Sequence, residues 1–151
     1  MLQLNLPQYN FRIKYENEKT YIFDSQRKKH VILTPEEWVR QNFIQFLIQD
    51  RGFPSAYIAI EKELILNGLK KRCDAVVYNE NAEPYIIVEF KAPNIPITQK
   101  TFDQLAVYNA KLKVNIFMIS NGIEHYCCKI DYENSKYNYF REIPTFPIEN
   151  Q

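Results

Sequence analysis

Apolar and polar positions alternate in two ways along the chain, and each way predicts a different kind of element. Near the N-terminus, residues 11–15 and 20–23 have the composition of two short strands around a polar turn. Residues 24–30 form a polar, basic connection, and residues 31–33 are typical of a third short strand. We therefore expect residues 1–33 to form a β extension that precedes the rest of the fold.

A helix is predicted to begin after Thr34. Thr34 is a favourable N-cap, Pro35 stands at the first helical position, and Glu37 follows Thr34 by three residues, as in a capping box. Apolar residues then recur at helical spacing, at Val39, Phe43, Phe46 and Leu47. We expect this helix to run to Gln49, because a Gly-Phe-Pro sequence follows shortly after it.

Three strands are predicted next, at residues 57–66, 72–78 and 85–91. Asn67 and Gly68 stand between the first two strands and are typical of a tight hairpin turn. The strongly apolar third strand, rich in Ile and Val, indicates that this part of the sheet is buried.

A second helix is predicted with Thr101 as its N-cap. One face of this helix carries Phe102, Leu105, Ala106 and Asn109. Strands are then expected at residues 114–120 and 123–130, and residues 137–141 are a candidate for a last edge strand. After the N-terminal extension, the predicted order is therefore α-β-β-β-α-β-β, which favours an α/β domain.

Composition and charge are those of one ordinary globular domain. The 151 residues allow a single domain, with 46% hydrophobic and 25% charged residues. The 19 Lys and Arg nearly balance the 18 Asp and Glu, which excludes a polybasic non-specific binder but not local binding of nucleic acid. The chain has three glycines, and their spacing fits neither a Rossmann fingerprint nor a Walker loop. We therefore expect no nucleotide cofactor.

Cysteine usage and the N-terminus indicate a reduced, cytoplasmic protein. The three cysteines include the adjacent pair Cys127 and Cys128, which would point to opposite faces of a strand, and their spacing suits neither disulfides nor zinc. The N-terminus lacks the apolar core of a signal peptide. No apolar run approaches eighteen residues, so we expect no membrane span.

Asp74, Glu89 and Lys91 are the strongest candidates for chemistry. Glu89 and Lys91 lie two residues apart, so they share one face of their predicted strand. A hairpin between that strand and the preceding one would bring Asp74 beside Glu89. The alternative is an exposed strand with a cross-strand ion pair. The apolar residues around Glu89 argue against it, because charges near a buried strand usually need a partner or a metal.

These residue types suit the hydrolysis of a phosphodiester bond. That reaction needs a hard cation that holds the phosphate and lowers the pKa of an attacking water. Mg²⁺ prefers oxygen ligands, and Asp74, Glu89 and a peptide carbonyl near Phe90 would supply them, with Mn²⁺ as a substitute ion. Lys91 would orient the water or stabilise charge that develops on the phosphorane.

The predicted helices add four further candidates. Glu36 shares the apolar stripe of the first helix and should face the sheet, and the alternative is a helix-dipole glutamate paired with Arg40. Glu37 is better explained by the capping box. On the second helix, Gln104 and Tyr108 lie one turn apart beside the apolar stripe, where they either support a site or form a surface pair.

Two basic runs, residues 27–29 and 70–72, are candidates for phosphate contacts. Arg72 belongs to the second run and comes two residues before Asp74. The alternative for both runs is solvated charge. Glu61 and Glu63 alternate along one predicted strand, where they either extend the acidic site or lie in solvent.

Taken together and in order, these motifs resemble the PD-(D/E)xK nuclease superfamily. More specifically, they are similar to the N-terminal nuclease domain of type I restriction enzyme R subunits and its short stand-alone relatives. The resemblance spans roughly residues 24–126. The stretches that carry it are TPEEWVRQNFIQFLIQDRGFP with Glu36 and Arg40, KRCDAVVY with Asp74, IIVEFKAP with Glu89 and Lys91, and FDQLAVYN with Gln104 and Tyr108.

The resemblance implies a restriction-endonuclease-like core in residues 34–142, with a central mixed sheet flanked by helices and residues 143–151 as a tail. It implies a divalent metal on Asp74 and Glu89, a catalytic Lys91 and an assisting Glu36. The residues expected to bind DNA or support the site are Gln104, Tyr108, Arg40 and Arg72.

DNA is thus the expected partner, with restriction-modification subunits or a second copy of the chain as further candidates. Type I R subunits carry a translocase after this domain, whereas this chain ends, so we expect no ATP-driven translocation. A catalytically silent module of the same fold that binds DNA or protein is the alternative to a DNA endonuclease. An enzyme that acts on RNA is a third hypothesis.

Overall fold

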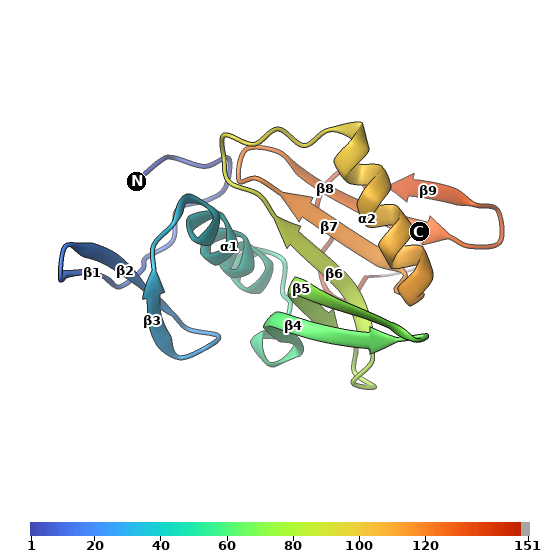
Figure 1. Cartoon of the computed structure of the whole chain (residues 1–151), viewed down its shortest axis with the longest axis horizontal. Helices are drawn as coiled ribbons and strands as arrows, with labels where there is room; N and C mark the ends of the chain where they lie inside the picture. Colours follow the sequence, from blue (N-terminus) through green and yellow to red (C-terminus); the bar gives the residue numbers. More distant parts are fainter. Residues whose placement is uncertain (149–151) are drawn as a thin grey trace.

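Figure 1 shows the computed structural model of the chain, which describes residues 1–148. A small antiparallel sheet lies beside helix α1, and a six-stranded sheet carries α1 and α2 on its opposite faces. The small sheet consists of β1 (Ile13–Glu16), β2 (Lys19–Asp24) and β3 (Lys29–Ile32). Neither helix in this part of the chain is long and apolar enough to cross a membrane.

The large sheet has the strand order β4-β5-β6-β7-β8-β9. All neighbours are antiparallel except β6 and β7, which are parallel because α2 carries the chain back between them. The strands are β4 (Ile58–Leu66), β5 (Leu69–Tyr78), β6 (Pro84–Phe90), β7 (Ile116–Ser120), β8 (His125–Asp131) and β9 (Lys136–Tyr139). The predicted element order and the mixed sheet flanked by helices are confirmed.

The large sheet buries both of its faces. Phe43 of α1 packs with Val88 in one core cluster, whereas Leu105 of α2 belongs to a second cluster on the opposite face. Cys127 joins the first cluster and Cys128 the second, as the strand periodicity predicted. Strands that are buried on both faces leave few positions for charge, so the charged residues concentrate at the strand ends and edges.

Helix α1 (Pro35–Gln45) begins where the sequence predicted. The Thr34 side-chain oxygen accepts a 3.0 Å hydrogen bond from the Glu37 amide. The helical segment ends at Asp50, one residue beyond the predicted Gln49, but its α-helical part ends at Gln45 and the π-helical turn η1 (Phe46–Asp50) follows. The wider turn keeps its first two residues buried while the chain turns towards the short 3₁₀ segment η2 (Ser55–Tyr57) and β4.

Helix α2 (Gln99–Leu112) begins three residues earlier than expected. Its N-cap is Thr98, whose side-chain oxygen accepts a 3.3 Å hydrogen bond from the Thr101 amide. The predicted cap at Thr101 was therefore wrong. Both threonines have the side chain of a cap, and the first one is used because its extended backbone allows the helix to start directly after it.

Two connections position the sheet and its edges. Asn67 and Gly68 form the predicted hairpin turn between β4 and β5, with φ values of 50° and 76° that fit a type I′ turn. The predicted C-terminal tail has no helix or strand over residues 143–148, yet it packs on the fold through the buried Ile143 and the ring of Phe146. Residues 149–151 of that predicted tail lie outside the described residues.

Candidate functional site

The β5–β6 hairpin brings Asp74 and Glu89 together. Ala75 pairs with Val88 across this hairpin, so one further step of the register sets Asp74 opposite Glu89. The Asp74 Oδ2 atom accepts a 2.8 Å hydrogen bond from the Phe90 amide, which holds the aspartate against the end of β6. In this position the charge of Asp74 acts on the Glu89 carboxyl group and raises its pKa.

Glu89 is a buried carboxyl group with too few partners. Its side chain is 14% exposed, and the Lys71 Nζ atom lies 3.0 Å from its Oε1 atom as an ion pair. The same Oε1 atom accepts no hydrogen bond of good geometry within residues 1–148. Burial, followed by the charge of Asp74, raises the pKa of Glu89 to about 7 against the opposing charge of Lys71. A cation is therefore better suited to this position than a second anion.

Glu36 and Lys91 approach the same place from α1 and from the end of β6. Burial and then the charge of Asp74 raise the pKa of Glu36, while the charges of Arg40 and Lys91 oppose that rise. Lys91 follows β6, and its amide donates a 2.9 Å hydrogen bond to β7 that continues the parallel pairing. We call the group of Glu36, Lys71, Asp74, Glu89 and Lys91 the carboxylate site.

Lys71 is the member of the carboxylate site that the sequence did not single out. Its ammonium lies 4.8 Å from the centre of the Tyr108 ring as well as 3.0 Å from Glu89. Tyr108 of α2 thus lies beside the site, whereas the Gln104 side chain is exposed and makes no hydrogen bond with another described residue. Lys71 stands in a run of three basic residues, and only the strand register distinguishes it from its neighbours.

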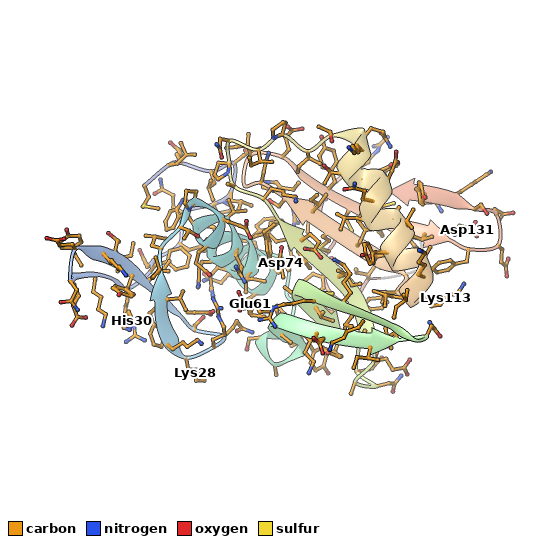
Figure 2. The ribbon with its side chains drawn as sticks, in the orientation of Figure 1. Lys28, His30, Glu61, Asp74, Lys113 and Asp131 are labelled. Atoms are coloured by element: carbon orange, nitrogen blue, oxygen red, sulfur yellow. The ribbon has the colours of Figure 1, made fainter. Side chains whose placement is uncertain are left out.

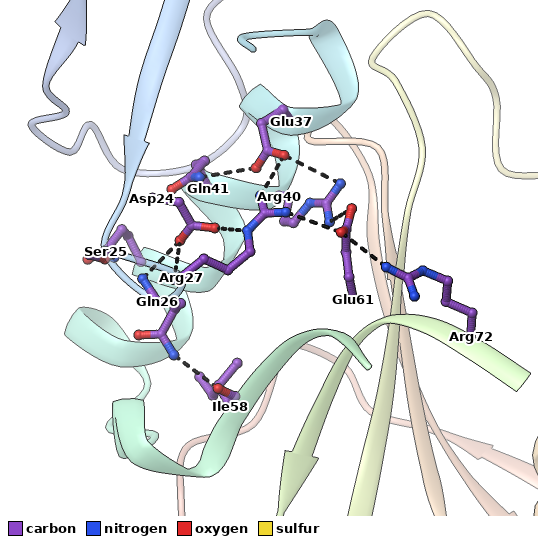
Figure 3. Close-up of polar contacts among 11 residues, drawn as sticks. Asp24, Ser25, Gln26, Arg27, Glu37, Arg40, Gln41, Ile58, Glu61 and Arg72 are labelled. Carbon is purple, nitrogen blue, oxygen red and sulfur yellow. Dashed lines mark hydrogen bonds and ion pairs between the residues drawn. The ribbon is translucent and has the colours of Figure 1, made fainter. Parts of the chain in front are cut away.

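A second charged group joins the small sheet to the large one (Figure 3). Arg27, in the loop between β2 and β3, pairs with Asp24 and lies 2.9 Å from the Glu37 Oε1 atom. Arg40 lies 3.5 Å from the same oxygen. The Asp24 and Glu37 side chains are only 4% and 7% exposed, so Arg27 neutralises carboxylates that water barely reaches.

Glu61 of β4 completes this group with three arginine partners. Its carboxylate lies 3.2 Å from Arg40, 3.3 Å from Arg27 and 3.3 Å from Arg72. Burial alone would raise the pKa of Glu61, but the charges of these arginines outweigh burial and hold the pKa below its ordinary value. We call the group of Asp24, Arg27, Glu37, Arg40, Glu61 and Arg72 the arginine cluster.

The capping-box role predicted for Glu37 was wrong. Its carboxylate accepts hydrogen bonds from Arg27 and Gln41 rather than reaching back to the start of the helix. A charged guanidinium is a stronger donor than a neutral backbone amide, which explains why the Glu37 carboxylate binds Arg27 in place of the amide at the start of the helix. Arg40 was considered as the ion-pair partner of Glu36. It instead contacts Glu37 and Glu61 of β4.

Four members of the two basic runs pair with carboxylates, whereas Lys28 and Lys29 of the first run are exposed. In the second run, Lys70 lies 3.6 Å from Glu63. Lys71 pairs with Glu89 of the carboxylate site, and Arg72 pairs with Glu61 of the arginine cluster. Arg27 of the first run is likewise paired. Glu61 and Glu63 therefore bind cations rather than extending an acidic surface.

The pair Asp74 and Glu89 suits a hard divalent cation. Within residues 1–148, no group of three or more His, Cys, Asp or Glu side chains is arranged to hold a metal ion. Mg²⁺, however, typically takes one or two carboxylates and keeps several waters. The Glu89 Oε1 atom, whose described partner is the Lys71 ammonium, fits such a ligand if the metal takes the place of that lysine. A surface hollow of about 820 Å³ lies elsewhere, between β9 and the C-terminal segment.

A comparison with known families decides the relationship. Residues 35–144 match the family described as type I restriction enzyme R protein N terminus. The chain belongs to this family. The match includes α1, the β5–β6 hairpin and α2, so the carboxylate site lies wholly within the type I R-protein N-terminal region. A search of curated proteins gave no match.

A solved structure shares the fold of this R-protein N-terminal domain. It is a fragment of a Vibrio vulnificus YJ016 protein designated an HsdR subunit of a type I restriction enzyme, with a TM-score of 0.53 and 20% identity. The alignment covers 75% of this chain and 24% of that chain. The matched chain is therefore much longer than the domain described here, and at this identity the likeness shows the fold alone.

Proposed function

We propose that this domain is a Mg²⁺-dependent endonuclease that hydrolyses the phosphodiester bonds of DNA. The observation that carries the proposal is the placement of Asp74 opposite Glu89 across the β5–β6 hairpin, where the charges of Glu36 and Lys91 also act. Membership in the R-protein N-terminal family supports a relation to restriction-modification. The order of Asp74, Glu89 and Lys91 also agrees with the PD-(D/E)xK pattern.

In this proposal Asp74 and Glu89 would hold Mg²⁺, or Mn²⁺ in its place, with a peptide carbonyl near Phe90 as a further ligand. The bound cation would neutralise phosphate charge and lower the pKa of a water. Asp74 is already held in place by the Phe90 amide, and Glu89 offers a buried oxygen that accepts no hydrogen bond. Both carboxylates would be ionised in the loaded site, because their mutual repulsion would be offset.

The remaining residues would handle water and DNA. The Lys91 ammonium orients the attacking water or stabilises charge that develops on the phosphorane. Glu36 lies at the start of α1 near Asp74, where it assists in positioning that water. The residues proposed to position DNA or support the site are Arg40, Arg72, Gln104 and Tyr108.

The partners and location in this proposal follow from the same relationship. DNA is the substrate, and restriction-modification subunits or a second copy of this chain are the proposed protein partners. A type I restriction enzyme acts on DNA inside the cell, so we propose the cytoplasm as the location.

The direct test is cleavage of supercoiled plasmid by purified protein with Mg²⁺, with Mn²⁺ and with EDTA. We expect cleavage with either metal and none with EDTA or in Asp74→Asn. Lys91→Ala should lose roughly 100-fold or more in rate. Lys62→Ala removes an exposed lysine of β4 and should cleave like the wild type. Cleavage that survives Lys91→Ala would remove Lys91 from the mechanism, and cleavage of RNA in place of DNA would change the substrate.

One observation favours a second function, a catalytically silent module of the same fold that binds DNA or protein. The Lys71 ammonium already lies against the carboxylate that would hold the metal. If Lys71 keeps metal out of the site, the domain retains DNA without cutting it. Retention of labelled DNA with no metal-dependent cleavage across varied substrates would select this function over the nuclease.

A further inference from the structure

Three guanidinium groups from separate elements converge on one small carboxylate (Figure 3). Arg27 comes from the β2–β3 loop, Arg40 from α1 and Arg72 from β5, and all three contact Glu61. Their distances of 3.2 to 3.3 Å exceed the 2.9 Å of the Arg27–Glu37 contact in the same cluster. Charge-assisted hydrogen bonds are usually about 2.7–2.9 Å long. The three contacts of Glu61 are therefore looser than a close charge-assisted hydrogen bond.

Arg40 has a donor that this carboxylate does not satisfy. Its side chain is 9% exposed, and its Nε atom is buried without a hydrogen-bond partner among the described residues. A buried charged donor without an acceptor is unfavourable, and native structures rarely leave one unexplained. Arg40 therefore has donor capacity beyond its contacts with Glu37 and Glu61.

Glu61 combines an unusual backbone conformation with a partly exposed side chain. Its φ of 50° is left-handed in the middle of β4, where a residue with a side chain is rarely found. The Glu61 side chain is 39% exposed and that of Arg72 is 66% exposed. A ligand can therefore approach the arginines from solvent, and the Glu61 carboxylate can turn outwards.

The arginine cluster adjoins the carboxylate site. Lys62 of β4 pairs with Cys73 of β5, so Glu61 stands opposite Asp74, one strand spacing of about 5 Å away. Figure 2 shows Glu61 and Asp74 in this region, where β4 and β5 meet α1. An anion held in place of Glu61 would thus lie next to the proposed catalytic carboxylates.

We propose that Arg27, Arg40 and Arg72 form a binding site for one backbone phosphate of a nucleic acid, and that Glu61 occupies this site in the free protein. The inference rests on the proposed function, because it takes DNA as the ligand. Binding exchanges the Glu61 carboxylate for a phosphate on the same three donors. Glu61 therefore lowers the affinity for DNA, and its removal raises that affinity.

The test measures binding of a fluorescent DNA duplex to the full chain in EDTA, by anisotropy at several salt concentrations. One phosphate contact contributes a factor of about three between 50 and 200 mM salt. We expect Glu61→Gln to bind at least about threefold more tightly than the matched control Glu63→Gln. Glu63 lies two residues along the same strand and contacts Lys70, so the control makes the same charge change outside the cluster.

A second pair of variants tests the site without altering Glu61. Arg72→Gln should bind about threefold more weakly than wild type and lower the slope of log affinity against log salt by about one. Lys70→Gln, which removes an equally exposed cation on the same strand, should have a smaller effect on both quantities. This pair decides the question if Glu61→Gln fails to fold, as judged by circular dichroism.

Two results would overturn the inference in folded variants. These are equal affinities for Glu61→Gln and Glu63→Gln, or equal affinities and salt slopes for Arg72→Gln and Lys70→Gln. The plasmid assay separates this from the proposed function. DNA binding that depends on the arginines, without cleavage in Mg²⁺ or Mn²⁺, would remove the nuclease and keep the phosphate site. Metal-dependent cleavage, combined with equal DNA affinities of the variants in each pair, would keep the nuclease and remove the phosphate site.

Discussion

The carboxylate site and the arginine cluster are neighbours in the large sheet, yet their charges are balanced in opposite ways. In the carboxylate site, burial and nearby carboxylates raise the pKa of Glu89 to about 7 and also raise that of Glu36. In the arginine cluster, three guanidinium groups hold the pKa of Glu61 below its ordinary value. The first group is short of positive charge, and the second has an arginine for every acid.

This difference separates two uses of buried charge. In the arginine cluster, the ion pairs join the β2–β3 loop, α1 and β4, so they stabilise the fold directly. In the carboxylate site, strand pairing in a strongly apolar sheet forces Asp74 and Glu89 together despite their repulsion. A group of acids that the fold holds in an unfavourable state is where a bound cation gains most.

The largest expected effect comes from removing the central cation of the arginine cluster. Arg27→Met leaves Asp24 and Glu37 buried without their best partner, and breaking such a buried pair typically costs about 3–5 kcal/mol. We expect the free energy of unfolding in urea to fall by about 3 kcal/mol or more. Lys28→Met, at the exposed neighbouring residue, is the matched control. Equal losses in the two variants would show that the cluster does not stabilise the fold.

The carboxylate site should respond in the opposite direction. Glu89→Gln keeps the size of the side chain and removes its charge, so we expect it to stabilise the protein above neutral pH. The shift of the Glu89 pKa from 4.5 to about 7 corresponds to about 3 kcal/mol as an upper value. Urea unfolding of wild type and variant between pH 4 and pH 8.5 measures the difference.

The sign of this pH dependence follows from proton binding. Below about pH 4.5 Glu89 is protonated in both the folded and the unfolded chain, so the variant gains nothing. Between about pH 4.5 and 7 the folded chain binds the proton more tightly, and wild-type stability falls as the pH rises. The gain of Glu89→Gln should therefore grow through this range and level off above it. Glu83→Gln, at an exposed residue beside β6, should show no such growth.

Much of this contrast was predictable from local sequence signals. The apolar stripe placed Glu36 towards the sheet, and the hairpin between two predicted strands placed Asp74 beside Glu89. Short-range patterns suffice for these features, because a turn and a strand period fix them. The misplaced cap at Thr101 shows the limit of such patterns, since Thr98 offers the same chemistry three residues earlier.

The partners of the charged residues were not predictable in the same way. Arg27 and Glu61 are 34 residues apart, and they meet only because the small sheet packs beside α1 and β4. The left-handed backbone of Glu61 has no signal in the sequence, because glutamate is not a residue that favours it. Lys71 was likewise hidden in a basic run until the strand register set it against Glu89.

Lys71→Met removes one of the two lysines of the carboxylate site. It should increase the difference in charge balance between this site and the arginine cluster. In the proposed metal site the Lys71 ammonium would compete with the metal for Glu89, and a partly buried ion pair is worth about 1 kcal/mol. We expect Mn²⁺ to bind roughly fivefold more tightly to the variant in isothermal titration calorimetry. Lys70→Met, at the exposed neighbour, should bind Mn²⁺ like the wild type. Weaker binding to Lys71→Met would show that Lys71 supports the site rather than competing in it.

The smallest effect should come from replacing Tyr108, whose ring contacts the Lys71 ammonium. Tyr108 is 46% exposed, and its ring centre lies 4.8 Å from the Lys71 Nζ atom. An exposed cation–π contact contributes about 0.5–1 kcal/mol, so Tyr108→Leu should lower the free energy of unfolding by about that amount. Tyr108→Phe keeps the ring and should leave stability unchanged. The Leu effect should vanish in Lys71→Met, because the contact needs both groups, and a double-mutant cycle that shows no coupling would exclude the contact as a source of stability.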